Sequence, residues 1–259
     1  PQCGGIMKHI GTGTQKVEEE LHALFPGAKV LRMDTDTVGA SHGHEKLLRQ
    51  FEEEKIPILL GTQMVAKGLD FENVTLVGVL CADASLYIDN YRAPERTFSL
   101  LSQVVGRAGR GSKQGRAIIQ TFTPENEVIR AAAAQDYDAF YESEIRMRRL
   151  RRYPPFADLF SFTVTGADES RVIRAAKALR DALGYAVERR EELKPLSIEV
   201  LGPAGASVVK VNNRYRYRVF LVGKGCPALR RLVAEYLYAF YQHKENRGLD
   251  IFADCNAIQ

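Results

Sequence analysis

Strand-like apolar segments alternate with amphipathic helical segments along the first 123 residues of the chain. Leu21, Leu24 and Phe25 recur at helical spacing, whereas residues 56–60 form an apolar run with the length of a buried strand. The expected elements are helix, strand, helix, strand, strand, helix and strand, at residues 18–25, 29–33, 44–54, 56–60, 74–80, 92–105 and 116–121. Strands that alternate with helices at this interval predict a parallel sheet with helices on both faces. Ligands of such sheets bind at the loops beyond the carboxyl ends of the strands.

A second pattern begins after the sequence Tyr-Pro-Pro-Phe at residues 153–156, which ends a helix and marks a boundary. The expected elements are a strand, a helix, three strands, a helix and a strand, at residues 159–165, 170–189, 197–201, 207–212, 214–222, 227–242 and 249–253. This order indicates a ferredoxin-like α+β domain, a split β-α-β arrangement. The sequence thus predicts an α/β lobe at 1–123, a helical connector at 124–155 and a small α+β domain at 156–259.

The connector is expected to be helical throughout from Pro124 to Arg152, because residues 131–134 are consecutive alanines. Its end carries five arginines within the seven positions 146–152. A solvated helix face explains such a run, and so does a grip on DNA phosphates that releases counterions.

Composition excludes several classes of protein. The 259 residues carry a net charge of +4, which permits a nucleic-acid partner without requiring one. There is no apolar run of membrane-spanning length and no secretory leader, and the four cysteines are scattered. We therefore expect a soluble, cytoplasmic protein without a disulfide framework.

The sequence Gln-Val-Val-Gly-Arg-Ala-Gly-Arg at residues 103–110 is the strongest candidate for a phosphate site. On a helix, Gln103, Arg107 and Arg110 share one face. Gly106 and Gly109 have no side chain to keep a large anion or another backbone away. Guanidinium groups bind phosphate oxygens through a planar fork of donors. The alternative interpretation is an exposed basic helix with a solvated face.

A polar, glycine-containing loop follows the predicted strand at 56–60 directly, with the sequence Gly-Thr-Gln-Met-Val-Ala-Lys-Gly-Leu-Asp-Phe. Its first two residues can offer a backbone N–H and a hydroxyl to a phosphate, and its lysine adds a positive charge. Its second glycine and its aspartate can meet a ribose or a phosphate-bound metal. The residues concerned are Gly61, Thr62, Lys67, Gly68 and Asp70. Taken singly, each is also ordinary turn chemistry.

Two further segments near the start of the chain suggest ligands. The sequence Gly-Thr-Gly-Thr at residues 11–14 precedes the first predicted helix, and it suits either a bound anion or a plain N-cap. Cys3, in Pro-Gln-Cys-Gly-Gly, looks like the second half of a Cys-x-x-Cys zinc knuckle whose first cysteine would precede Pro1. Because one cysteine cannot complete a tetrahedral site, Cys3 is interpreted as an orphaned zinc ligand, with an accidental cysteine as the alternative.

Residues 61–71 and 103–110 resemble motifs V and VI of superfamily 2 helicases. The Thr-Gln-Met-x-Ala-Lys-Gly sequence, the Tyr-Arg-Ala-Pro-Glu-Arg sequence at 91–96 and the half knuckle at Cys3 resemble the replication-restart helicases of the primosomal protein N′ (PriA) type. The resemblance extends over essentially the whole chain. It implies that residues 1–123 are the second RecA-like lobe of a helicase.

The resemblance also implies roles for individual residues. Arg107 and Arg110 match arginine-finger positions, with Gln103 beside the nucleotide. Residues expected to contact ATP are Gly68, Asp70 and Gly106. Residues expected to face a single DNA strand are Thr12, Thr62, Gln63 and Lys67.

The implied activity is ATP-driven unwinding in the 3′ to 5′ direction at stalled or repaired forks. It implies forked and single-stranded DNA, the single-strand binding protein and other primosome-loading proteins as partners. ATP and Mg²⁺ are the implied cofactors, with Zn²⁺ in the full-length protein, and we expect a monomer. However, the sequence contains neither a P-loop nor a Walker B strand. We therefore expect a first lobe upstream of Pro1 and predict that this chain alone neither hydrolyses ATP nor unwinds DNA.

Arginines alternate with apolar residues in the predicted strand at 214–222. Arg214, Arg216 and Arg218 fall on one face, and with Lys210 nearby this face either holds nucleic acid or keeps an exposed sheet soluble. Two other functions stay open for the whole chain. One is a stand-alone nucleic-acid or protein-binding adaptor with a degenerate lobe, although such an adaptor has no need of an arginine finger. The other is a different superfamily 2 translocase.

Overall fold

The computed structural model describes residues 13–34, 43–62, 74–106 and 115–257. The chain divides into two compact units, one of Pro1–Ile88 with Arg92–Ser143 and one of Asp89–Tyr91 with Glu144–Gln259. The division falls inside a helix, so the connector expected at 124–155 contributes to both units. No helix in the described ranges is long and apolar enough to span a membrane.

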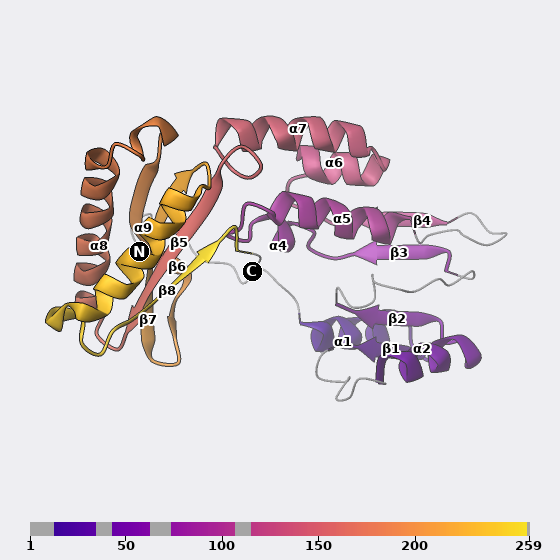
Figure 1. The fold of residues 1–259 in the computed structure, drawn as a ribbon. Coiled ribbons are helices and arrows are strands. Elements are labelled where there is room, and N and C mark those ends of the chain that lie inside the picture. Colours follow the sequence, from indigo (N-terminus) through magenta and orange to yellow (C-terminus); the bar gives the residue numbers. More distant parts are fainter. Residues whose placement is uncertain (1–12, 35–42, 63–73, 107–114, 258–259) are drawn as a thin grey trace, which may run out of the picture. The chain divides into compact units, whose positions relative to one another are not determined.

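The first unit contains parallel strands connected by helices, as the sequence predicts (Figure 1). Its elements are α1 Thr14–Leu24, β1 Val30–Met33, α2 Gly43–Glu53, β2 Ile58–Gly61, β3 Leu76–Val79, α4 Asp83–Leu86, α5 Ala93–Val105, β4 Arg116–Ile119, α6 Glu127–Ala134 and α7 Tyr137–Leu150. Within the described residues the strands form two parallel pairs, β1–β2 and β3–β4, rather than the single sheet that was expected. The four-residue helix α4 was not predicted, because it is too short to show helical periodicity.

Helix α5 packs its apolar face against α6 and α7. Phe98 and Leu101 are buried on α5, and the Phe98 ring stacks on the Phe140 ring with centroids 4.1 Å apart. Ile129 and Ala132 of α6 belong to the same buried cluster. Burying one such large side chain stabilises the fold by about 1.5–3 kcal/mol. This packing fixes α5 as a rigid element of the first unit.

The expectation of one continuous helix from Pro124 to Arg152 is wrong. Helix α6 ends at Ala134, and Gln135 adopts the left-handed conformation with φ 56°. The backbone N–H of Asp136 then donates to the Ala131 carbonyl at 2.9 Å, which closes the helix end. Helix propensity alone does not reveal the break, since both flanking segments favour helix.

The second unit has the predicted ferredoxin-like order of elements. They are β5 Asp158–Gly166, α8 Glu169–Arg189, β6 Glu199–Val211, β7 Arg214–Gly223, α9 Pro227–Gln242 and β8 Asp250–Cys255, with short 3₁₀ turns at Lys194–Leu196 and Lys244–Asn246. The strand order is β6-β7-β5-β8, and all neighbours are antiparallel.

The two strands predicted at 197–201 and 207–212 form one strand, β6. Its pairing with β7 is interrupted between Leu201 and Ala204 and again between Gly205 and Lys210. Gly202 has φ 101°, and Pro203 has no N–H to donate, so the sequence looks like a turn although the strand continues.

One face of this sheet carries the core, which α8 and α9 cover (Figure 1). Phe162, Val164 and Val219 are fully buried on the strands, and Leu183 and Leu229 are fully buried on the helices. Alternate residues of β5 and β7 point away from this core. The second unit therefore has one sheet face packed on the helices and one open face that α8 and α9 do not cover, on which Thr163 and Arg218 are nevertheless buried.

Candidate nucleotide and nucleic-acid sites

Two of the residues predicted to face the nucleotide lie at the end of α5. Figure 1 shows that α5 runs antiparallel to β3, so Gln103 and Gly106 lie toward the amino ends of the β3–β4 pair. Gln103 is exposed, and its Nε2 donates to Ser99 Oγ at 3.2 Å. Gly106 is the C-cap, and its N–H donates to the Ser102 carbonyl at 3.0 Å. The helix thus presents a polar side chain to solvent in its last turn.

Several predicted site residues lie outside the described residues. They are the arginine-finger candidates Arg107 and Arg110, the ATP-contact candidates Gly68 and Asp70, the DNA-contact candidates Thr12, Gln63 and Lys67, and the zinc candidate Cys3. Their roles stay predictions. Thr62 is described, and it lies exposed directly after the carboxyl end of β2, where a ligand-binding loop is expected.

The start of α1 favours the plain helix-start interpretation over an anion site. The N-cap is Gly13, and the Thr14 hydroxyl donates to Asp34 Oδ2 at 2.7 Å. Asp34 is 5% exposed, and Arg32 Nε lies 3.0 Å from the same oxygen. A carboxylate of the chain itself therefore stands near this helix start, where a negative charge is stabilised.

Sequence reasoning missed a buried carboxylate, Asp83, at the start of α4. Asp83 is 5% exposed and accepts hydrogen bonds from Thr121 Oγ1 at 3.0 Å, the Phe122 N–H at 2.9 Å and Thr123 Oγ1 at 2.7 Å. Burial alone raises the pKa of this carboxyl, but the three hydrogen bonds outweigh burial and hold its pKa below the ordinary value. Asp83 thus joins α4 to the segment that follows β4. The sequence signal was an aspartate a few residues after a strand, which is too common to single out.

The alternation along β7 is as predicted, but its arginines are not equally available. Tyr215 and Tyr217 pack against the core, which leaves Arg214, Arg216 and Arg218 on the open face. Arg218 is only 8% exposed. Arg214 donates to Thr165 Oγ1 and to the Thr165 carbonyl, both at 3.2 Å, and pairs with Asp250. Arg216 is therefore the best placed of the three to meet an external ligand.

Lys210 does not join this arginine row. It pairs directly with Tyr215 across the β6–β7 ladder, and its Nζ lies 4.8 Å from the centre of the Tyr215 ring. Directly opposed residues share a face of the sheet, so Lys210 lies on the side of the tyrosines. Because Lys210 is close to Arg214 in sequence, the two were expected on one basic face. The strand register instead puts Lys210 on one face of the sheet and the three arginines on the other.

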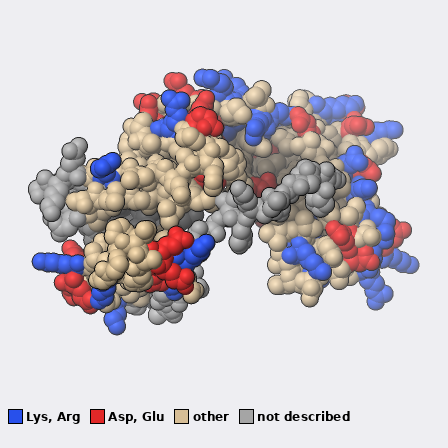
Figure 2. Space-filling model, turned by 180° about the vertical axis from the view of Figure 1, so that it is seen from behind, with Lys and Arg blue, Asp and Glu red and all other residues tan. Residues whose placement is uncertain are grey.

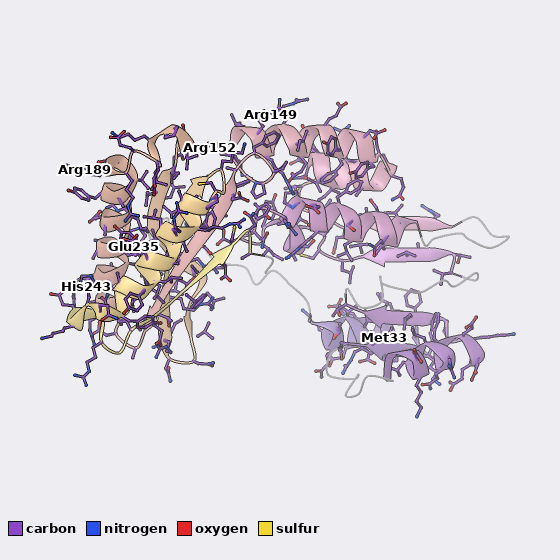
Figure 3. The ribbon with its side chains drawn as sticks, in the orientation of Figure 1. Met33, Arg149, Arg152, Arg189, Glu235 and His243 are labelled. Atoms are coloured by element: carbon purple, nitrogen blue, oxygen red, sulfur yellow. The ribbon has the colours of Figure 1, made fainter. Side chains whose placement is uncertain are left out.

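The arginines at the end of α7 divide between structural and exposed positions. Arg148 pairs with Glu144 at 2.7 Å, and Arg152 pairs with Glu199 and donates to the Ser197 carbonyl at 2.6 Å. Arg149 is exposed and lies 4.9 Å from the centre of the Phe156 ring (Figure 3). Figure 2 shows basic and acidic side chains interspersed on the visible face. A single large basic surface is therefore not a feature of that face.

Two protein families match the chain. Residues 10–112 match the family described as Helicase conserved C-terminal domain, and residues 149–256 match Primosomal protein N C-terminal domain. Over 257 residues the chain is 41% identical to Replication restart protein PriA of Bacillus subtilis, which is 99% of this chain and 31% of that protein.

The chain belongs to the PriA family of replication restart proteins.

Other PriA proteins match the chain with similar identity and coverage. The PriA protein of Synechocystis is 40% identical over 85% of this chain and 26% of its own length. That of Treponema pallidum is 38% identical over 90% of this chain and 34% of its own length. The chain thus spans about a third of the length of these relatives. Of the two matches, one covers most of the parallel-strand lobe and the other the antiparallel domain, so the two predicted folds are confirmed.

Proposed function

We propose that this chain is the C-terminal half of an ATP-dependent DNA helicase that moves 3′ to 5′, restarts stalled replication forks and loads the primosome. The observation that supports this proposal is the junction at the end of α5. There an exposed Gln103 precedes Arg107 by four positions in the sequence, within the helicase match. An adaptor with a degenerate lobe has no use for this arrangement.

The proposed chemistry divides the nucleotide site between two lobes. Arg107 and Arg110 stabilise the charge that develops at the γ-phosphate, and Gln103 lies beside the nucleotide. Gly68 and Asp70, with Gly106, contact ATP. Mg²⁺, when bound, neutralises phosphate charge, and its ligands belong to a P-loop lobe that precedes this sequence.

An ATPase assay tests whether the nucleotide site is divided between two lobes. We expect the isolated chain to hydrolyse ATP no faster than buffer, with or without single-stranded DNA. In the full-length protein, Arg107→Ala and Arg110→Ala should each lower kcat by about 10³-fold or more, the typical contribution of an arginine finger. The matched control is Arg116→Ala, which removes an exposed arginine at the start of β4 and should leave kcat unchanged. ATP turnover by the isolated chain at the full-length rate would contradict the proposal.

For DNA, we propose that Thr12, Thr62, Gln63 and Lys67 face the single strand and that the open sheet face of the second unit adds phosphate contacts. Arg216 is the test residue, because replacing Arg214 or Arg218 also breaks internal contacts. Arg216→Ala should weaken DNA binding and lower the slope of log affinity against log salt by about 1. Lys210→Ala, on the other face, is the control. Equal salt slopes for Arg216→Ala and the parent protein would remove the sheet face from the proposal.

The remaining assignments follow from the same proposal. Single-strand binding protein and other primosome-loading proteins are the proposed partners, in the cytoplasm, with the protein acting as a monomer. Zinc in the full-length protein would be held by Cys3 together with cysteines outside this sequence. Within the described ranges there is no group of three His, Cys, Asp or Glu side chains that suits a metal ion.

A further inference from the structure

One side-chain amide joins the ends of two helices in the first unit. Gln135 follows α6, and its Nε2 donates to the Ala132 carbonyl at 3.0 Å, in the last turn of α6. The same nitrogen donates to the Ser102 carbonyl at 3.2 Å, in the last turn of α5. Each of these carbonyls also accepts from a backbone N–H, that of Gly106 for Ser102 and that of Gln135 for Ala132, so the side-chain amide adds a second donor at each helix end. Both N–H groups of the Gln135 amide serve this purpose.

The Ser102 carbonyl links Gln135 to the candidate nucleotide site. This oxygen also accepts from the N–H of Gly106, which closes the end of α5. A carbonyl oxygen has two lone pairs, and Gly106 and Gln135 use them together. Gln103 lies in this turn, and Arg107 is the next residue of the chain after Gly106.

The Gln135 amide also faces Gly106 itself. A β-carbon built on Gly106 would lie 3.2 Å from the Ser102 carbonyl oxygen and 3.7 Å from Gln135 Oε1. The nitrogen of the amide therefore holds the carbonyl of the last turn, while its oxygen lies at van der Waals distance from the space beside the glycine. The end of α5 is supported from outside the helix at the point where the candidate site begins.

We propose that Gln135 is a positioning residue for ATP hydrolysis, which fixes the last turn of α5 and through it Gln103. This inference rests on the proposed function, because it concerns the same nucleotide site. Gln135 acts through the backbone of Ser102 and Gly106. Its loss weakens the alignment of groups that act in the transition state, so kcat falls while the KM for ATP is unchanged.

The variant Gln135→Gly distinguishes a positioning role of Gln135 from a role in folding stability. Glycine removes the amide but adopts a positive φ without strain, so the lost hydrogen bonds are offset and the melting temperature stays close to that of the parent. In the full-length protein we expect kcat to fall about threefold to tenfold, the factor by which one net hydrogen bond biases a local equilibrium. In the chain itself, the Gly106 amide should exchange with solvent faster by a similar factor, measured by NMR.

Two variants complete the test. Gln135→Glu keeps the side-chain length but lacks the N–H donors, so it should lower kcat as Gln135→Gly does. Arg130→Ala removes an exposed side chain of α6 and leaves Gln135 and the end of α5 unaltered, so its kcat should match the parent.

The outcomes distinguish this inference from the function on which it rests. If Gln135→Gly and Gln135→Glu keep the parental kcat while Arg107→Ala abolishes hydrolysis, Gln135 is only the cap of α6 and the inference fails alone. A raised KM for ATP, or a fall in melting temperature of several degrees in Gln135→Gly, would assign a structural role and also overturn it. If Arg107→Ala hydrolyses ATP at the parental rate, the proposed function itself fails.

Discussion

The buried carboxylate of Asp83 gives the sharpest test of what holds the first unit together. Asp83→Ala removes the acceptor for two hydroxyls and one backbone N–H, from Thr121, Thr123 and Phe122. At about 1 kcal/mol of net stability for each hydrogen bond, the expected loss is about 3 kcal/mol. Asp83→Asn keeps the shape and one acceptor oxygen but not the charge, so its expected loss is about 1–2 kcal/mol.

The pH dependence follows from the direction of the pKa shift. Because the folded state holds the pKa of Asp83 below the ordinary value of 3.8, ionised Asp83 stabilises the folded protein above that pH. The contribution disappears as the pH falls through the lowered folded-state pKa. The difference in free energy of unfolding between the parent and Asp83→Asn should therefore be constant from about pH 5 to 7 and should shrink below about pH 4.

Urea unfolding followed by circular dichroism measures these differences, and hydrogen exchange locates them. The Phe122 amide, which donates to Asp83, should lose protection in Asp83→Ala. Asp138→Asn is the control, since Asp138 is exposed in the first turn of α7 and its replacement should cost no more than about 0.5 kcal/mol. If Asp83→Ala and Asp138→Asn unfold at the same urea concentration and Phe122 exchanges at the parental rate, the carboxylate does not hold these elements together.

Two further predictions concern the second unit. Gly166→Ala should destabilise the protein by about 1–3 kcal/mol in urea unfolding, because the β-carbon of the new alanine would clash with Leu249 Cδ2. The control is Gly184→Ala, which should be neutral or stabilising because nothing lies within 4 Å of the position of its β-carbon. Tyr217→Phe should lower the free energy of unfolding by about 1 kcal/mol, because the Tyr217 hydroxyl donates to Glu169 Oε1 at 2.8 Å, and equal stability of the two proteins would show that this bond contributes nothing.

Local patterns in the sequence predicted the elements of the fold well. The helix expected at 227–242 has those bounds, because Pro227 marks its start and apolar residues recur at helical spacing along it. The ferredoxin-like order followed from the sequence of strands and helices alone. The break at Gln135 and the continuity of β6 were missed, because each depends on backbone conformation that neighbouring residues do not determine.

The candidate site was harder to predict from the sequence wherever the role of a residue depends on its strand register or on a partner far away in the chain. Lys210 was assigned to the arginine face because it lies close to Arg214 in sequence, but the face of a strand residue depends on register, and a shift of one residue reverses it. Asp83 and Gln135 act through partners 38 and 33 residues away, and no spacing rule connects them. The exposed position of Gln103 did follow from helical periodicity.

The irregular pairing of β6 has a consequence for solubility. β6 is an edge strand of the second sheet, and an edge strand normally offers a row of backbone groups to which a strand from another molecule can add. Pro203 removes one donor from that row, and the two register shifts prevent a straight strand from matching the remaining groups. These interruptions protect the domain from edge-to-edge aggregation.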